Sequence, residues 1–258
     1  MSSDASSFNE LASVYNEVRP GYPIEVYDVI SKHVEYNEHS RLLEIGAGQG
    51  IATKEIYDRW LSNITAIEPG KNLYNLMIHK FKNNSQISIV NSTFEEFASD
   101  KKYDGIFSAT AFHWIDSKIK FEKTYELLNN DSFLILYWNN YGINNAELED
   151  QIKKIYTKYG FPESNKSSDE IRNDKILQRK NEVIQSSLFD LIEHTEINNT
   201  IEYSSDSYIK LLRTFPDHSK DKIPNIEFMY KDIESILLGC NMKIDVKVIV
   251  NLEIAKKS

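Results

Sequence analysis

The fold of this protein is decided by residues 42–50, which read LLEIGAGQG. Together with Arg41, the apolar first half of this stretch predicts a short strand that ends at Ile45. The glycines that follow allow the backbone to turn sharply and allow a ligand to approach the main chain closely. A helix is expected directly after them, at residues 51–61. The alternative is a tight strand-to-helix turn that holds no ligand.

Strand and helix patterns alternate beyond this loop. This βαβ alternation predicts an α/β fold, a doubly wound and mostly parallel sheet with helices on both faces. Two later strands separated by helices predict an antiparallel C-terminal edge, which brings the sheet to seven strands. The expected strands are 41–45, 64–67, 87–90, 105–109, 132–138, 192–203 and 243–254, and the expected helices between them include 72–81, 121–128, 146–159, 205–214 and 226–238.

No convincing linker interrupts the chain, so we expect a single domain over residues 1–258. Within it, residues 8–34 are expected to form N-terminal lid helices, 35–141 the cofactor-binding core, and 142–258 cap helices and the final strands. Asn129-Asn130-Asp131 predicts a turn. The polar segment 162–181 predicts a mobile insertion.

Composition excludes several classes of protein. The chain has 30 Lys and Arg against 39 Asp and Glu, a net charge of −9, which argues against a nucleic-acid partner. Its one cysteine, Cys240, excludes an intrachain disulfide, and the six histidines form no metal-binding pattern, so no metal is expected. No apolar run is long enough for a membrane helix and no secretory signal is visible, so the sequence predicts a cytoplasmic protein without a membrane partner.

The spacing of the glycines and Glu44 set this loop apart from a dinucleotide site. Dinucleotide loops follow the pattern G-x-G-x-x-G, whereas the third glycine here is Gly50, one position early. Glu44 precedes the first glycine by two residues, where a pyrophosphate would gain nothing from a carboxylate. Glu68 ends the second strand, where an acid can accept both ribose hydroxyls. The pair indicates a ligand with a ribose and a cationic group but no phosphate, a description that S-adenosylmethionine meets.

These residues resemble class I S-adenosylmethionine-dependent methyltransferases. Glu44 and the glycine loop look like the first motif of that superfamily, and Glu68 looks like its ribose-binding acid. Two further segments, YNEVRPGYP at 15–23 and SATAFHWID at 108–116, resemble a branch of small-molecule enzymes akin to the trans-aconitate methyltransferases. The resemblance extends from about Phe8 to Ile254 and implies a Rossmann-like methyltransferase fold.

The resemblance also implies a cofactor site. Phe94 is a candidate to cover the adenine face, although a core phenylalanine is an equal alternative. Arg19 is a candidate partner for the cofactor carboxylate, with a surface arginine as the alternative. The implied cofactor-binding residues are Tyr15, Arg19, Glu44, Gly46, Ala47, Gly48, Glu68, Pro69, Thr93, Phe94 and Ala109.

The acceptor side is less defined. His113 is a candidate general base, or else it orients the substrate. Trp114, Trp138 and Tyr141 are expected in the substrate pocket or in packing of the cap. Arg213 is a candidate partner for an anionic acceptor, with a structural salt bridge as the alternative.

The sequence thus predicts a methyltransferase that transfers a methyl group to a small molecule, mainly by positioning it. The first alternative is a catalytically silent protein that binds S-adenosylmethionine and acts as a regulator or interaction partner. A second is a nicotinamide-dependent oxidoreductase, against which Glu44 and the misplaced third glycine count. The sequence specifies neither the acceptor nor the oligomeric state.

Overall fold

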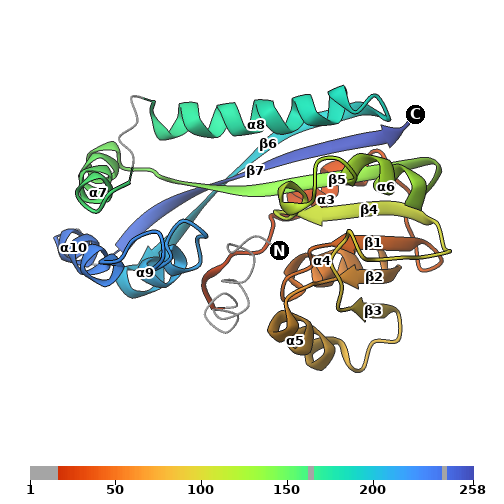
Figure 1. The fold of residues 1–258 in the computed structure, drawn as a ribbon, viewed down its shortest axis with the longest axis horizontal. Coiled ribbons are helices and arrows are strands. Elements are labelled where there is room, and N and C mark those ends of the chain that lie inside the picture. Colours follow the sequence, from red (N-terminus) through yellow and green to blue (C-terminus); the bar gives the residue numbers. More distant parts are fainter. Residues whose placement is uncertain (1–16, 162–165, 240–242) are drawn as a thin grey trace. The chain divides into compact units, whose positions relative to one another are not determined.

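The structure is a computed structural model that describes residues 17–161, 166–239 and 243–258 (Figure 1). Residues 8–16 of the expected N-terminal lid helices, including Tyr15, lie outside these residues, as does Cys240.

Contacts within the chain group it into two compact units. We call the first the core unit; it comprises Gly21–Asn139, Asp174–Ile197 and Ile249–Ser258. We call the second the cap unit; it comprises Met1–Pro20, Asn140–Asn173 and Asn198–Val248. The expected core ends at residue 141, and the first segment of the core unit ends at Asn139. The single domain expected over 1–258 stays a prediction.

The core unit begins with helix α3 (Ile24–Ile30), which starts directly after Pro23, a residue whose fixed φ suits a helix start. Strands and helices then alternate as the sequence predicts. They are β1 (Arg41–Ile45), α4 (Ile51–Trp60), β2 (Asn63–Ile67), α5 (Lys71–Phe81), β3 (Ile87–Val90), β4 (Tyr103–Ala109), the 3₁₀ turn η1 (Phe112–Trp114) and α6 (Lys120–Leu127).

The seven strands form one sheet in the order β3-β2-β1-β4-β5-β7-β6. β1 pairs in parallel with β2 on one side and with β4 on the other. The chain first moves outward from β1 to β3 and then returns to the opposite side of β1 at β4. This reversal makes the carboxyl ends of β1 and β4 the topological switch point, where doubly wound sheets bind their ligands.

Three long strands complete the sheet: β5 (Leu128–Ile143), β6 (Phe189–Ser204) and β7 (Lys243–Lys257). In Figure 1, β7 runs opposite to its neighbour β5, which confirms the mostly parallel sheet with an antiparallel C-terminal edge.

The turn expected at 129–131 is instead a bulge inside β5. Tyr103 pairs with Leu128 and Gly105 pairs with Phe133, so β5 carries extra residues opposite Asp104. Asp131 takes a positive φ of 59° there, and Asn129 donates to the Asp104 carboxylate at 2.7 Å. The hydrogen bond from Asn129 to Asp104 takes the place of backbone hydrogen bonds between the strands at the bulge, and β5 continues beyond it.

The mobile insertion expected at 162–181 is wrong for most of its length. Residues 168–185 form the long helix α8 (Ser168–Gln185), which has only two buried side chains, Ile176 and Val183. An apolar stripe this narrow gives almost no periodic signal. The sequence did contain a capping box: Ser167 Oγ accepts from Glu170 N at 3.2 Å, and Glu170 accepts from Ser167 N at 2.7 Å.

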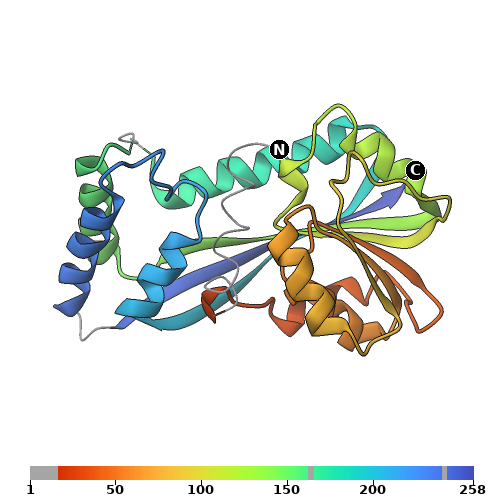
Figure 2. The same cartoon turned by 60° about the horizontal axis from the view of Figure 1, so that its bottom comes forward.

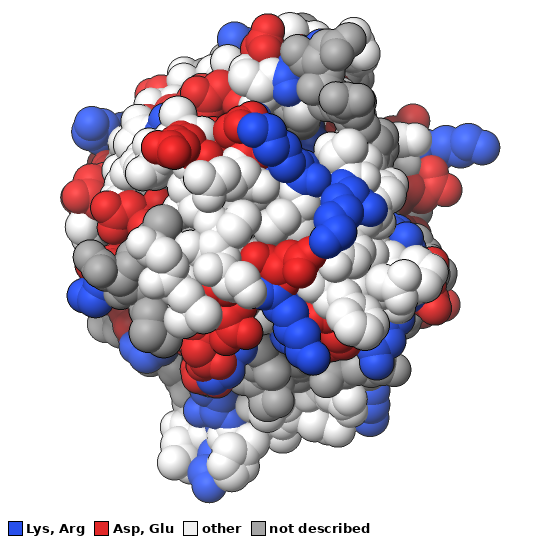
Figure 3. Space-filling model, turned by 90° about the vertical axis from the view of Figure 1, so that its left-hand side faces the viewer, with Lys and Arg blue, Asp and Glu red and all other residues white. Residues whose placement is uncertain are grey.

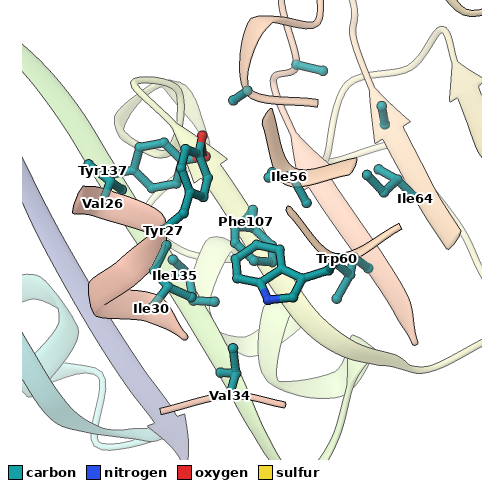
Figure 4. Close-up of a cluster of buried hydrophobic side chains, with 14 of the residues drawn as sticks. Val26, Tyr27, Ile30, Val34, Ile56, Trp60, Ile64, Phe107, Ile135 and Tyr137 are labelled. Atoms are coloured by element: carbon teal, nitrogen blue, oxygen red, sulfur yellow. Dashed lines mark hydrogen bonds between the residues drawn. The ribbon is translucent and has the colours of Figure 1, made fainter. Parts of the chain in front are cut away.

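Alternate residues of the strands fill two hydrophobic clusters in the core unit. On one face, α3, α4 and α5 pack against the sheet, and Tyr27, Trp60 and Phe107 lie in this cluster (Figure 4). On the other face, α6 and α8 contribute Phe121, Leu127 and Val183. Figure 2 shows these two sets of helices on opposite sides of the strands.

The cap unit has its own hydrophobic cluster. It is built by α7 (Ala146–Lys158), α9 (Ser205–Arg213) and α10 (Ile226–Leu238), with the ends of β5, β6 and β7. Figure 3 shows the side of the structure on which α7 and α10 lie. Positive and negative side chains are interspersed there with uncharged surface.

Candidate cofactor site

The glycine loop after β1 has a backbone that only glycine adopts easily. Gly46, Gly48 and Gly50 have φ values of +70°, +60° and +74°. A Cβ on Gly46 would lie 2.3 Å from the Cβ of Ala111, and one on Gly50 would lie 2.5 Å from the Phe81 ring. A Cβ on Gly48 would meet nothing within 4 Å, so only its φ calls for glycine there.

The loop is held from several sides. The backbone N–H groups of Gly46 and Ala47 both donate to the Ile67 carbonyl of β2, each at 3.0 Å. Lys80, on α5, donates to the carbonyls of Gln49 and Gly50 at 3.2 and 2.9 Å. Sequence analysis missed Lys80, since a lysine in the last turn of a helix normally only complements the helix dipole.

Glu68 joins the loop to the end of β2. One carboxylate oxygen accepts from Gly48 N at 2.8 Å, and the other accepts from Gly70 N at 2.7 Å. The side chain is only 5% exposed, and this burial raises its pKa to about 7 despite both hydrogen bonds. A carboxylate has about four lone-pair sites, so two remain available to ribose hydroxyls.

Glu44 is buried beneath the loop. It accepts from Thr53 Oγ1 on α4 at 2.5 Å, while its second oxygen has no partner among the described residues. Burial raises the pKa of Glu44 to about 8. A buried carboxyl with one unbonded oxygen is chemically suited to a cationic partner.

The end of β4 carries backbone strain. Ala109 is followed by Thr110, whose φ of +58° is unusual for a β-branched residue. Thr110 accepts from Asn139 N at 3.3 Å and is hydrogen-bonded to Tyr22 Oη at 3.0 Å. Strain of this kind is concentrated at ligand sites, and it lies at the switch point of the sheet.

His113 lies in η1, directly beyond this strained residue. Its Nδ1 accepts from the indole N–H of Trp138 at 3.2 Å. Because indole only donates, the neutral imidazole carries its own proton on Nε2. Desolvation, together with the cations Arg179, Lys120 and Lys175, lowers the pKa of His113 to about 4. The ring is therefore a hydrogen-bond donor at neutral pH.

The two tryptophans differ in exposure. Trp114 is 39% exposed, and its ring centroid lies 4.7 Å from that of His113. Trp138 is 2% exposed, and the guanidinium of Arg179 lies 4.5 Å from its ring centroid. Arg179, from α8, is a second residue that sequence analysis missed, because the helix was not expected.

The segment after β3 was expected to wrap the adenine. Asn91 Nδ2 donates to the carbonyls of Glu68 and Pro69 at 2.8 and 3.0 Å, so it ties this segment to the proposed ribose site. Thr93 accepts from Glu96 N at 3.2 Å. Phe94 is 3% exposed and packs in the core, as the alternative interpretation held. The adenine contacts of Thr93 and Phe94 stay predictions.

Three of the expected site residues that the structure describes belong to the cap unit. Arg19 donates to Thr214 Oγ1 at 2.8 Å and to its carbonyl at 3.1 Å. Tyr141 lies against the same guanidinium, 5.1 Å from ring centroid to Arg19 Cζ. Arg213 forms a bidentate pair with Glu227, 2.7 Å for each bond, as the salt-bridge alternative held.

Neither a metal-binding cluster nor a membrane-spanning helix is found in the part of the chain that the structure describes. No group of three or more His, Cys, Asp or Glu is placed to hold a metal ion there. No helix among these residues is long and apolar enough to cross a membrane.

Comparison with known proteins finds similarity to methyltransferases. Residues 24–128 match the family model for ribosomal RNA adenine dimethylase. An uncharacterized methyltransferase of Schizosaccharomyces pombe is 27% identical over 125 residues, which cover 48% of this chain and 49% of that protein. The chain spans about half the length of the three yeast relatives that it matches.

Solved structures extend the likeness to the whole fold. A protein provisionally assigned as a type II methyltransferase from Anaeromyxobacter dehalogenans superposes with a TM-score of 0.67 over 92% of this chain and 97% of that one, at 12% identity. The chain has a Rossmann-like methyltransferase fold. A phosphoethanolamine N-methyltransferase of Haemonchus contortus, solved with S-adenosylhomocysteine, superposes with a TM-score of 0.53 at 14% identity. The superposition covers 99% of this chain and 57% of the Haemonchus chain.

These comparisons confirm the resemblance to class I methyltransferases, and they agree with S-adenosylmethionine as the cofactor. The narrower likeness to trans-aconitate methyltransferases stays a prediction, as does the cytoplasmic location.

Proposed function

We propose that the protein is an S-adenosylmethionine-dependent methyltransferase that acts on a small molecule. The observation that carries this proposal is the carboxylate of Glu68, which bonds the glycine loop through Gly48 N at 2.8 Å beside the switch point of the sheet. The names of the relatives and the S-adenosylhomocysteine of one structural neighbour support the choice of cofactor.

In this proposal the core unit supplies most of the cofactor contacts. Glu68 accepts the ribose hydroxyls, with Pro69 beside it. Glu44 and the backbone of the loop at Gly46, Ala47 and Gly48 hold the cationic methionine end, close to Ala109. The bound cofactor supplies an activated methyl group on a sulfonium.

The chain's own task is then to orient the acceptor and exclude water. Alignment alone contributes roughly 7–11 kcal/mol in well-oriented reactions, so no strong base is required. The proton of His113 lies on Nε2, which supports orientation of the acceptor by donation over the role of general base. Trp114 and Trp138 flank His113, and the substrate-pocket roles of Tyr141 and Arg213, like the cofactor roles of Tyr15 and Arg19, are further parts of the proposal.

RNA is the rival acceptor, because the matching family model describes a ribosomal RNA enzyme. The net charge of −9 counts against it, since RNA binding depends on neutralising phosphates. The silent S-adenosylmethionine-binding protein is the other rival.

Calorimetric titration with S-adenosylmethionine, S-adenosylhomocysteine and NADH tests the cofactor. Saturable binding of the first two alone is expected, and binding of NADH alone would overturn the proposal. A radiolabelled-methyl assay over small-molecule and RNA acceptors then tests the substrate. Label in a small molecule is the expected result, label only in RNA would replace the acceptor class, and binding without any transfer would favour the silent protein.

A further inference from the structure

The cap unit contains a cavity of about 660 Å³. It lies between α7, the start of α8, α9 and the adjoining ends of β5 and β7, and all the described residues that line it belong to this one unit. Its volume is within the range of small-molecule sites, roughly 300–1,000 Å³. Buried aliphatic side chains, Ile152, Leu211 and Leu212, form part of the lining.

Aromatic rings form much of the remaining wall. The ring of His218 lies 5.5 Å from Tyr156, 5.6 Å from Phe161 and 5.7 Å from Phe215, measured between centroids. Phe215 in turn lies 5.4 Å from Tyr141. All five rings line the cavity, and such a wall favours a ligand with a flat apolar body.

His218 provides a polar atom in the cavity wall that the described packing leaves without a hydrogen-bond partner. Its Nδ1 is buried and has no hydrogen-bond partner among the described residues. Burial lowers the pKa of His218 to about 4, so the ring is neutral at pH 7. A buried nitrogen of a neutral imidazole either accepts or donates one hydrogen bond, and leaving it unmade is unfavourable.

The charged residues beside the cavity are already paired. Lys153 lies 3.0 Å from Glu149, and Lys154 lies 2.7 Å from Asp150. Lys166, which also lines the cavity, has an interaction of its own.

We propose that the cap unit binds an uncharged, ring-bearing small molecule in this cavity, and that a hydroxyl or amide of the ligand hydrogen-bonds to His218 Nδ1. This goes beyond the proposed function, because the ligand binds within the cap unit and does not require the cofactor; Tyr141, a predicted substrate-pocket residue, is the residue that the two proposals share.

The experiment uses two probes of the same shape on the full chain without cofactor: 2-naphthol, which carries a hydroxyl, and 2-methylnaphthalene, which does not. The wild type is expected to bind one equivalent of 2-naphthol about fivefold more tightly than 2-methylnaphthalene, the worth of one net hydrogen bond. His218→Leu is expected to remove that preference while still binding both probes.

Gly142→Trp is the blocking variant. Gly142 lines the cavity, and a Cβ there meets nothing within 4 Å, so the bulky ring is expected to fill the space without disturbing the strand. Gly142→Trp should raise the Kd of both probes at least tenfold. Phe228→Ala, at a 61% exposed residue of α10 outside the cavity, is the matched control and should bind as the wild type does.

Circular dichroism and thermal melting confirm that each variant is folded before it is scored. Three results would overturn the proposal: no saturable binding of either probe by the wild type, unchanged binding in Gly142→Trp, or an unchanged preference for 2-naphthol in His218→Leu.

Discussion

Two buried carboxyl groups of the core unit, Glu68 at the end of β2 and Glu253 within β7, have similar acidity and different surroundings. They are 5% and 1% exposed, and burial raises the pKa of each to about 7. Each oxygen of Glu68 accepts a backbone N–H. Both oxygens of Glu253 lack a hydrogen-bond partner among the described residues, and His194 Nδ1 lies 3.8 Å away.

A neighbour of Glu253 in β7 also lacks hydrogen-bond partners among the described residues. Asn251, two residues earlier on the same face of β7, has both amide atoms buried without a partner in the described structure. The charge of Arg179 favours the ionised form of Glu253, yet the net shift of the pKa is upward. A raised pKa therefore does not by itself identify a ligand site, and the role proposed for Glu68 depends instead on its hydrogen bonds to two loops.

The largest expected effect separates the two acids by cofactor binding. Glu68→Ala removes two charge-assisted bonds that shape the loops at Gly48 and Gly70, so we expect the Kd for S-adenosylmethionine to rise on the order of 100-fold. Glu253→Gln, the matched control, should leave the Kd within about twofold. Calorimetry measures both, and equal losses in the two variants would erase the distinction.

A smaller effect concerns stability and its pH dependence. The folded pKa of Glu253, about 7, lies above the unfolded value of 4.5, so its contribution to stability is complete below about pH 4.5 and is lost as the pH rises through 7. Glu253→Gln has no proton to lose. We therefore expect its advantage in stability over the wild type to grow by about 2 kcal/mol between pH 5 and pH 8.

Urea unfolding at the two pH values measures this difference. If the free energy of unfolding depends on pH in the same way in the wild type and in Glu253→Gln, the Glu253 carboxyl is not the source of that dependence.

Proton release on cofactor binding tests the role proposed for a third buried acid, Glu44. Its pKa in the folded protein is about 8. Glu44 is mostly protonated at pH 7, and a cationic ligand beside it favours the ionised form. We expect S-adenosylmethionine binding at pH 7 to release a substantial fraction of one proton, and Glu44→Gln to release less. Calorimetry in buffers of different ionisation enthalpy measures the release; identical values would remove Glu44 from the cationic end.

The smallest effect is expected at an exposed ion pair. The side chains of Arg213 and Glu227 are 36% and 50% exposed, so solvent screens their bidentate contact. Arg213→Ala should reduce the free energy of unfolding by less than about 1 kcal/mol and should leave cofactor binding unchanged. Loss of cofactor binding would show that Arg213 does more than hold the cap together.

Local sequence was sufficient for the strands and helices whose apolar stripe is broad. Helix α10 was expected at Ile226–Leu238 and has those bounds, because five of its side chains are buried with helical spacing. Helix α8 was missed because tertiary contacts at two positions, with the Lys120–Glu182 pair at 2.6 Å, replace an apolar face.

The candidate site divides in the same way. Glu44, the glycines and Glu68 could be recognised because a short motif fixes both their residue types and their backbone. Lys80 and Arg179 could not, since each acts on a loop or ring that is distant in the sequence.

By itself, the sequence determined the order of strands and helices, the glycine loop and the acids beside it, because these depend on periodicity and on backbone angles that glycine alone adopts readily. Only the tertiary structure decided which acids are hydrogen-bonded, which nitrogen of His113 carries the proton, and where the cap leaves a cavity. Those properties depend on burial and on partners that the chain brings together only when it folds.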